Sequence, residues 1–304
     1  MTYAVCCQIK DERDYVKEFA EHHLKIGFDD IFFYEDYESV SHKDIFEDNP
    51  NVHVCTIAEA GVPNYHGTGT QSALYKKLLN DVKSEGKYDW VAFIDVDEFI
   101  MFGDDYDLEK LCSEFFNCTG IWLAWKMYNA NGHIKRPVGS VIENYPKPLE
   151  EKSYNMVDAS KTRTMWNKKS LVNLHMAKYW CNIHQIADGC DVLHNGNISA
   201  QKVFEKAWIN HYFSKSWEDY CVRIQSRGNM NNSIRSYDQF FIQNPELLPR
   251  MRELIEKERY KHAKCTMYLS RRMGLISGGN IDIIKRIEDG TYGDICDDVE
   301  ILYV

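Results

Sequence analysis

The stretch that decides the fold is Trp-Val-Ala-Phe-Ile-Asp-Val-Asp-Glu-Phe, at residues 90–99. Its first five residues form an unbroken apolar run, which is typical of a strand buried on both faces of a sheet. The run ends at Asp95, and Asp97 follows two positions later. Carboxylate oxygens are the ligands that Mg²⁺ and Mn²⁺ prefer, so the pair predicts a divalent-cation site at the end of this strand. The competing interpretation is a solvated turn.

Strands and helices alternate in the chain before this stretch. Short apolar runs predict strands at 3–9, 30–34 and 52–57, and apolar residues at helical spacing predict helices at 14–26 and 71–83. This order predicts an α/β fold with a doubly wound, mostly parallel sheet flanked by helices. Ligands of such sheets bind beyond the carboxyl ends of the strands, so we expect residues 10–13, 35–36 and 95–98 to line one edge together.

The later part of the chain predicts more strands and helices and then a basic segment. Strands are expected at 120–126, 170–174 and 180–183, and helices at 108–116, 216–227 and 237–244. We predict one domain over residues 1–245 and a helical C-terminal appendage over 246–304 packed on it. A basic amphipathic helix there could also contact an anionic membrane peripherally, although docking on the domain is the favoured interpretation.

Composition excludes several classes of protein. The 304 residues are 44% hydrophobic and 27% charged, as in soluble globular chains, and a net charge of −10 argues against nucleic acid as a partner. No apolar run is long enough to span a membrane. The first ten residues carry no basic segment ahead of an apolar stretch, and none of the ten cysteines forms a Cys-x-x-Cys pair. We therefore expect a cytoplasmic protein with reduced thiols, with peripheral contact at the inner membrane face as an option.

Three enzyme classes carry acidic pairs at the end of a strand. A haloacid-dehalogenase-type phosphatase would place its nucleophilic Asp near the start of the chain, with Thr or Val where Phe99 stands. A nucleotidyltransferase would carry a glycine-rich basic loop after its first strand, and residues 8–13 contain no glycine. A metal-dependent nucleotide-sugar transferase needs acidic residues after the first, second and fourth strands. Because the chain has all three, this class is favoured.

Several blocks resemble glycosyltransferase family 92 and its bacterial family-2-like relatives. Residues 9–18 and 22–29 resemble the opening block, although Asp11 stands where the family has Asn, and residues 90–99 resemble the block with the acidic pair. The later blocks are matched by Trp125, Tyr128, 132–133 and 136–137, and then by 211–212, 215–218 and 227–228. The resemblance implies a GT-A-type, Rossmann-like fold, a UDP-sugar donor, a divalent metal and inversion at the anomeric carbon.

The resemblance, together with the topology, also implies roles for individual residues. Asp97 would ligate Mn²⁺ or Mg²⁺, and Asp95 would contact the metal or the donor ribose. A late histidine completes the metal shell in many GT-A enzymes; His211 is the first candidate and His184 the second, although a lone histidine is more often structural. The nucleoside would be held by Lys10, Asp11, Glu12 and Asp36.

An inverting transferase also needs a carboxylate base on the acceptor hydroxyl. Glu143 and Asp188 rank ahead of Glu218 and Asp238 as candidates, and the sequence does not decide between them. Arg227 could meet the phosphates, since arginine suits bidentate phosphate contacts, or could form a surface ion pair.

Acceptor contacts are expected from Trp125, stacking on a sugar ring, and from His133, bonding a sugar hydroxyl. We thus predict a nucleotide-sugar-dependent hexosyltransferase that acts on a glycan or lipid-linked glycan acceptor in cell-surface polysaccharide biosynthesis. The alternatives are a metal-dependent phosphohydrolase using the same Asp pair and a non-catalytic GT-A-like binding protein.

Overall fold

A computed structural model describes residues 1–37, 39–65, 68–149, 156–158, 163–165, 168–177, 180–186, 199–227 and 237–255. The chain divides into two compact units. The first contains Met1–Tyr128 and Ser140–Phe213, and the second contains Asn129–Gly139 and Ser214–Val304. The predicted appendage over 246–304 lies largely outside the described residues, and its boundary near 245 stays a prediction.

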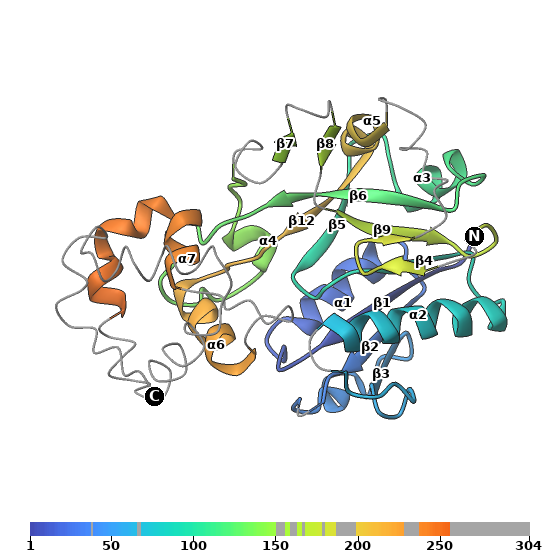
Figure 1. The fold of residues 1–304 in the computed structure, drawn as a ribbon, viewed down its shortest axis with the longest axis horizontal. Helices are drawn as coiled ribbons and strands as arrows, with labels where there is room; N and C mark the ends of the chain where they lie inside the picture. Colours follow the sequence, from blue (N-terminus) through green and yellow to red (C-terminus); the bar gives the residue numbers. More distant parts are fainter. Residues whose placement is uncertain are drawn as a thin grey trace. The chain divides into compact units, whose positions relative to one another are not determined.

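An eight-stranded mixed sheet forms the body of the first unit, in the order β3-β2-β1-β4-β9-β6-β12-β5 (Figure 1). Its strands are β1 (Tyr3–Ile9), β2 (Asp30–Glu35), β3 (Val52–Thr56), β4 (Trp90–Phe93), β5 (Glu98–Phe102), β6 (Gly120–Met127), β9 (Lys168–Asn173) and β12 (Ala207–His211). The first four strands are parallel to one another. Strand β9 runs antiparallel between β4 and β6, and β5 pairs antiparallel with β12 at the edge.

The other elements of the first unit are helices and two short hairpins. The helices are α1 (Val16–Lys25), η1 (Lys43–Phe46), α2 (Thr68–Glu85), α3 (Leu108–Glu114), α4 (Val141–Asn144) and α5 (Ser199–Lys206). Strands β7 (Met156–Asp158) and β8 (Arg163–Met165) form one hairpin, and β10 (Trp180–Asn182) and β11 (Gln185–Ile186) form the other.

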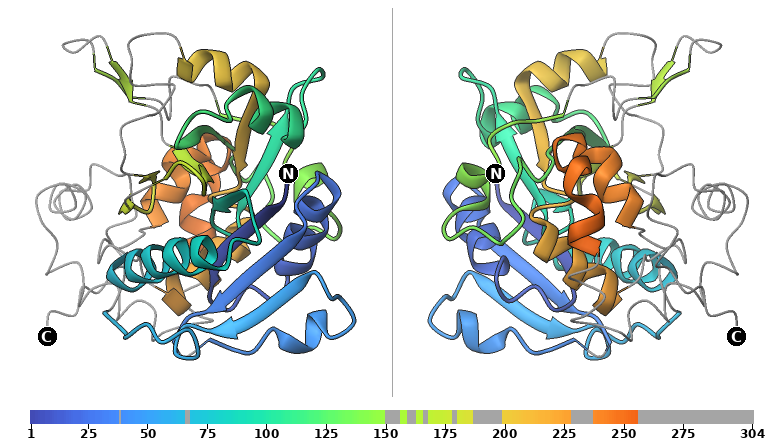
Figure 2. Two further views of the ribbon diagram at one scale, coloured as in Figure 1. Left: turned by 90° about the vertical axis from the view of Figure 1, so that its right-hand side faces the viewer. Right: turned by 90° about the vertical axis from the view of Figure 1, so that its left-hand side faces the viewer.

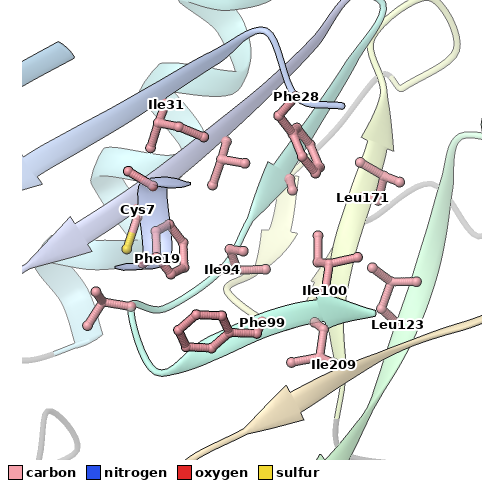
Figure 3. Packing of buried hydrophobic residues seen from close by; sticks show 14 of the residues in the cluster. Cys7, Phe19, Phe28, Ile31, Ile94, Phe99, Ile100, Leu123, Leu171 and Ile209 are labelled. Carbon is pink, nitrogen blue, oxygen red and sulfur yellow. The ribbon is translucent and has the colours of Figure 1, made fainter. Parts of the chain in front are cut away.

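Two hydrophobic cores cover the two faces of the sheet, because successive side chains of a strand point to opposite faces. Cys7 of β1 belongs to the core that contains Phe19 of α1, Phe99 and Ile209 (Figure 3). Cys6 belongs to the other core, with the apolar residues of α2. Helices α1 and α2 therefore lie on opposite sides of the parallel strands (Figure 2). The predicted α/β architecture is confirmed.

Histidines of α1 cover the outer edge of β5. His22 Nε2 donates to the carbonyl oxygen of Ile100 at 2.8 Å, and the Ile100 N–H donates to His23 Nε2 at 3.3 Å. His23 Nδ1 donates in turn to the carbonyl oxygen of Phe19 at 2.8 Å. An edge strand would otherwise present unpaired backbone groups, and here side chains satisfy both groups of one residue.

The second unit contains α6 (Trp217–Arg227), α7 (Tyr237–Gln243) and η3 (Pro245–Arg250). Trp217 packs its ring against Phe240 and Phe241 of α7. Arg136 Nε donates to Asp219 Oδ1 at 2.6 Å, and the N–H of Trp217 donates to the carbonyl oxygen of His133 at 3.1 Å. These contacts join the 129–139 segment to α6 within this unit.

Most predicted elements before residue 130 match the structure within a few residues, but β5, α5 and β12 were not predicted. Six described cysteines are free thiols, and four of these are buried. Among the described residues, no helix combines the length and apolar character needed to cross a bilayer.

Candidate functional site

The turn between β4 and β5 is a tight, largely buried structure. The Glu98 N–H donates to the carbonyl oxygen of Asp95 at 3.0 Å, and the Asp95 N–H donates to Glu98 Oε2 at 2.9 Å. Asp97 is 3% exposed and Glu98 is fully buried. The interpretation of this stretch as a solvated turn is therefore wrong.

Both carboxylate oxygens of Asp95 are held by side chains from other elements. Lys169 Nζ of β9 donates to Oδ2 at 2.7 Å, and Gln71 Nε2 of α2 donates to Oδ1 at 2.8 Å. Burial is the largest influence on Asp95 and would raise its pKa, but the charge and the hydrogen bond of Lys169, together with His211, outweigh burial, so the pKa lies below its usual range. Burial raises the pKa of Glu98 well above the usual value even though Lys169 Nζ lies 3.9 Å from Oε2.

Asp97 and His211 meet at the end of β12. The antiparallel pairing of β12 with β5 sets His211 opposite Glu98, and the N–H of Tyr212 donates to the carbonyl oxygen of Asp97 at 2.8 Å. This register leaves Asp97 Oδ1 3.5 Å from His211 Nε2, and both side chains are buried. A carboxylate oxygen and an imidazole nitrogen at this separation can both bind one divalent cation.

Trp125 of β6 contacts both candidate histidines. Its ring centroid lies 4.3 Å from that of His211 and 5.6 Å from that of His184. His184 sits in the β10–β11 hairpin, where its Nδ1 is 3.2 Å from the carbonyl oxygen of Lys168. Burial, reinforced by the Lys169 charge, lowers the pKa of His184. Of the two histidines, His211 is therefore the one that directly faces Asp97.

The protein side chains fit a metal only in part. Across the described ranges, no group of three or more His, Cys, Asp or Glu side chains is arranged to hold an ion. Asp97 and His211 supply two donors of suitable chemistry, and Mg²⁺-type ions commonly take one or two protein ligands and complete their shell with water and substrate phosphates. The pair fits an ion that is shared with a phosphate ligand.

The ends of the first, second and fourth strands lie along one edge of the sheet, as the topology predicted. The Asp36 N–H donates to the carbonyl oxygen of Ile9 at 2.8 Å. The hydroxyl of Tyr75 accepts from the N–H of Gln8 and donates to the carbonyl oxygen of Ile94, each at 3.3 Å. A tyrosine of α2 thus ties the end of β1 to the end of β4.

The loop after β1 carries Lys10, Asp11 and Glu12. Asp11 has a left-handed backbone, with φ of 54°, and its Oδ1 accepts from the N–H of Val40 at 3.0 Å. The Asp11 N–H donates to Ser39 Oγ at 3.1 Å. Lys10 and Asp36 are partly exposed beside this loop, so they are available to a ligand.

A buried histidine supports this loop from beneath. His42 Nε2 accepts from the N–H of Glu12 at 3.1 Å, and its Nδ1 lies 3.2 Å from Glu35 Oε1. The N–H of His42 also donates to Glu35 Oε1, at 2.5 Å. With its ring fully buried, His42 fixes the end of β2 and the start of the β1–α1 loop relative to each other.

The remaining predicted site residues lie elsewhere or are not described. Glu143 is an exposed residue of α4, and its N–H donates to Ser140 Oγ at 3.4 Å. His133 belongs to the second unit, and Arg227 ends α6 there. Asp188 lies outside the described residues, as does the side chain of Arg227.

Lys169, His42 and Gln71 were not predicted. Lys169 directly precedes the predicted strand at 170–174, but a lysine at the start of a strand usually indicates an exposed end. No motif in the neighbouring sequence indicates a role for His42 or Gln71. Each is positioned by a hydrogen bond to a residue far away in the sequence, Glu12 for His42 and Asp95 for Gln71.

The profile of glycosyltransferase family 92 matches residues 81–250, more than half of the chain. The chain belongs to glycosyltransferase family 92. Family membership confirms the predicted class of enzyme, and the GT-A-type fold expected for it agrees with the observed sheet. No curated protein sequence matches this family 92 chain significantly.

Solved structures resemble the chain only distantly. Glucosyl-3-phosphoglycerate synthase from Mycobacterium tuberculosis, in complex with Mn²⁺, UDP and glucosyl-3-phosphoglycerate, is 14% identical, with a TM-score of 0.29 over 41% of this chain and 44% of that one. A 4-diphosphocytidyl-2C-methyl-D-erythritol synthase is 14% identical, with a TM-score of 0.34 over 58% and 76%. The galactosyltransferase LgtC, in complex with donor and acceptor sugar analogs, is 13% identical, with a TM-score of 0.25 over 57% and 58%. The match thus covers only about half of two of these three structures.

Proposed function

We propose that this family 92 chain transfers a sugar from a UDP-sugar to a glycan acceptor, with inversion and with the help of Mn²⁺ or Mg²⁺. The observation that carries the proposal is the buried Asp97–His211 pair, 3.5 Å apart, beside the ordered carboxylate of Asp95. This cluster stands at the sheet edge where open α/β sheets bind nucleotides. Family membership supports glycosyl transfer, the UDP-sugar donor is inferred from the resemblance to the family, and the metal is inferred from the resemblance and from the Asp97–His211 pair.

Asp97 and His211 would hold the ion, which supplies Lewis-acid neutralisation of a diphosphate leaving group when bound. The buried backbone bond from Tyr212 to Asp97 fixes the acidic turn against β12, so the two ligands are pre-positioned. Asp95 is 32% exposed, and each carboxylate oxygen keeps a lone pair beyond the bonds from Lys169 and Gln71. It can therefore accept a hydrogen bond from a ribose hydroxyl without turning.

The nucleoside would bind over the β1–α1 loop and Asp36. Lys10 and Asp36 are partly exposed, while Asp11 and Glu12 are tied down by backbone bonds to Val40, Ser39 and His42. A loop ordered before binding loses little conformational entropy when the nucleotide arrives. Arg227 is proposed as a phosphate contact on sequence grounds.

The acceptor contacts are proposed from the sequence. Glu143 and Asp188 remain the candidates for the base, and His133 for a sugar hydroxyl contact. Trp125 packs on His211 and His184, so a contact from this indole would reach a ligand next to the metal pair. The proposed acceptor is a glycan or a lipid-linked glycan. The proposed reaction takes place in the cytoplasm, during biosynthesis of a cell-surface polysaccharide.

Thermal unfolding in the presence of nucleotides tests the proposal without knowledge of the acceptor. A ligand that binds only the native state raises the midpoint. We expect UDP with Mn²⁺ to raise it, and GDP, CDP and dTDP with Mn²⁺, or UDP alone, to raise it much less. Asp97→Asn serves as the site variant and should abolish the Mn²⁺-dependent part of the shift.

Three outcomes would contradict the proposal. The absence of any shift with every nucleotide at millimolar concentration would exclude a nucleotide-sugar donor. Phosphate release from simple phosphoesters that depends on Asp95 would instead identify a phosphohydrolase. Donor binding with no turnover across a panel of glycan acceptors would indicate a binding protein.

A further inference from the structure

A fully buried lysine, Lys169, contacts the acidic turn of residues 95–98. Lys169 lies on β9, between β4 and β6, and its register partner on β6 is Leu123. Its side chain has no exposed surface, and its Nζ contacts Asp95 Oδ2 at 2.7 Å and lies 3.9 Å from Glu98 Oε2. An ammonium buried among apolar side chains is costly unless carboxylates compensate it. The carboxyl groups of Asp95 and Glu98 in the acidic turn therefore compensate the charge of Lys169.

The lysine changes what the acidic turn offers to a cation. Three carboxyl groups stand within four residues, at Asp95, Asp97 and Glu98. Lys169 and Gln71 occupy one lone pair on each oxygen of Asp95 and fix its orientation. Asp97 and His211 form the pair proposed to hold a cation, and the positive charge of Lys169 lies beside the neighbouring carboxylate of Asp95.

Among the described residues, Asp97 and His211 are the two side chains proposed to meet an ion that arrives alone, and Lys169 places a positive charge near them. A diphosphate brings both negative charge and additional oxygen ligands, which this partial site lacks. Coupling between two ligands is reciprocal: the factor by which the diphosphate raises the affinity for the metal is also the factor by which the metal raises the affinity for the nucleotide.

We infer that Lys169 makes divalent-cation binding conditional on the nucleotide diphosphate, so that metal and donor load together. The inference rests on the proposed function and adds a positioning residue to it. Lys169 acts through Asp95 and the local field, without touching the donor or the metal.

Titration of Mn²⁺ followed by electron paramagnetic resonance tests this, because the signal of the free aqueous ion reports binding without any turnover. Wild-type protein, Lys169→Met and Lys169→Arg are titrated with and without UDP. We expect wild-type protein to bind Mn²⁺ roughly tenfold or more tightly with UDP than without it. In Lys169→Met, the affinity for Mn²⁺ alone should rise by roughly tenfold or more, and the gain from UDP should shrink by a similar factor. Lys169→Arg, which keeps the charge, should behave like wild-type protein.

Lys87→Met is the matched control, since it removes the same charge from an ion pair with Asp30, 2.8 Å away, on strand β2. It should leave both Mn²⁺ affinities unchanged. Circular dichroism verifies that each variant folds; if Lys169→Met does not fold, Lys169→Gln gives the same comparison with a hydrogen-bond donor retained for Asp95.

The results separate the two proposals. A folded Lys169→Met or Lys169→Gln variant that binds Mn²⁺ alone no more tightly than wild-type protein overturns the role of Lys169, as does tight binding of Mn²⁺ alone by wild-type protein. A wild-type protein whose affinity for Mn²⁺ does not respond to UDP overturns the proposed donor site itself.

Discussion

Asp97 Oδ1 and His211 Nε2 lie 3.5 Å apart because the edge strand β5 leaves the acidic turn and pairs antiparallel with β12. The turn that carries the acidic pair and the strand that carries the histidine are thus linked by backbone hydrogen bonds, and the N–H of Tyr212 closes the link on the carbonyl oxygen of Asp97. The pairing of β5 with β12 brings Asp97 and His211 together, and burial restricts both side chains. The geometry of the proposed metal pair is therefore set by the fold itself.

The first prediction concerns the choice between the two histidines. His211→Ala should weaken Mn²⁺ binding in the presence of UDP by roughly tenfold or more, because it removes one of the two metal ligands proposed among the described residues. His184→Ala should change it several-fold less, since His184 packs on Trp125 and bonds the Lys168 carbonyl. Isothermal titration with both variants gives the two affinities. Equal losses in the two variants would contradict the assignment of His211.

The second prediction concerns the support of the nucleoside loop. His42→Ala removes the ring that accepts from the Glu12 N–H and lies beside Glu35 Oε1, while the bond from the backbone N–H of residue 42 to Glu35 remains. Loss of the acceptor of a buried N–H costs about 1–3 kcal/mol, so the loop should loosen. We expect UDP affinity to fall roughly tenfold at saturating Mn²⁺, as measured by titration calorimetry.

His53→Ala is the matched control for the loop. This half-exposed histidine lies on the edge strand β3, and its Nε2 is 2.8 Å from Asp30 Oδ1. Its UDP affinity should equal that of wild-type protein. If His42→Ala is folded and binds UDP normally, the loop of residues 10–12 does not hold the nucleoside.

The parallel half of the sheet could be predicted from the sequence because its pattern is local. Each strand there is an apolar run followed by a polar turn, and Asp95 and Asp36 fall at strand ends by topology alone. The edge pair β5–β12 could not be predicted from the sequence. Strand β12 is only five residues long, and its register with β5 depends on pairing between segments that are far apart in the chain. Lys169 was missed for a related reason: its burial depends on Asp95 and Glu98, which the sequence shows only as distant carboxylates.

The third prediction concerns the dependence of stability on pH. Burial lowers the pKa of His23 well below 6.5 and, despite the bond to Ile100, also lowers that of His22. The unfolded chain then binds more protons than the folded chain below about pH 6.5, so stability is complete above that pH and falls as the pH drops toward the folded pKa. His23→Gln should flatten the fall of the thermal midpoint between about pH 6.5 and 4.5 while costing about 1–3 kcal/mol at pH 8.

His53→Gln provides the comparison, since it removes a half-exposed histidine instead of a buried one. Its midpoint should keep the wild-type dependence on pH. A His23→Gln midpoint that falls as steeply as that of wild-type protein would show that other groups dominate acid unfolding.

The last prediction concerns the junction at which β5 ends beside the chain that enters β12. The N–H of Gly103 donates to the carbonyl oxygen of Lys206 at 2.9 Å, and a Cβ at residue 103 would lie 2.6 Å from the carbonyl oxygen of Glu205. Backbone cannot yield as a flexible side chain can, so Gly103→Ala should destabilise the fold by about 1–3 kcal/mol in urea unfolding. Gly86→Ala has open space around its Cβ and only the strain of a positive φ, 65°, and should cost about 1 kcal/mol. Because the same junction aligns β12 with β5, we expect Gly103→Ala, unlike Gly86→Ala, also to weaken Mn²⁺ binding with UDP. Full retention of stability and of Mn²⁺ binding in Gly103→Ala would contradict the role of this edge pairing in placing His211 beside Asp97.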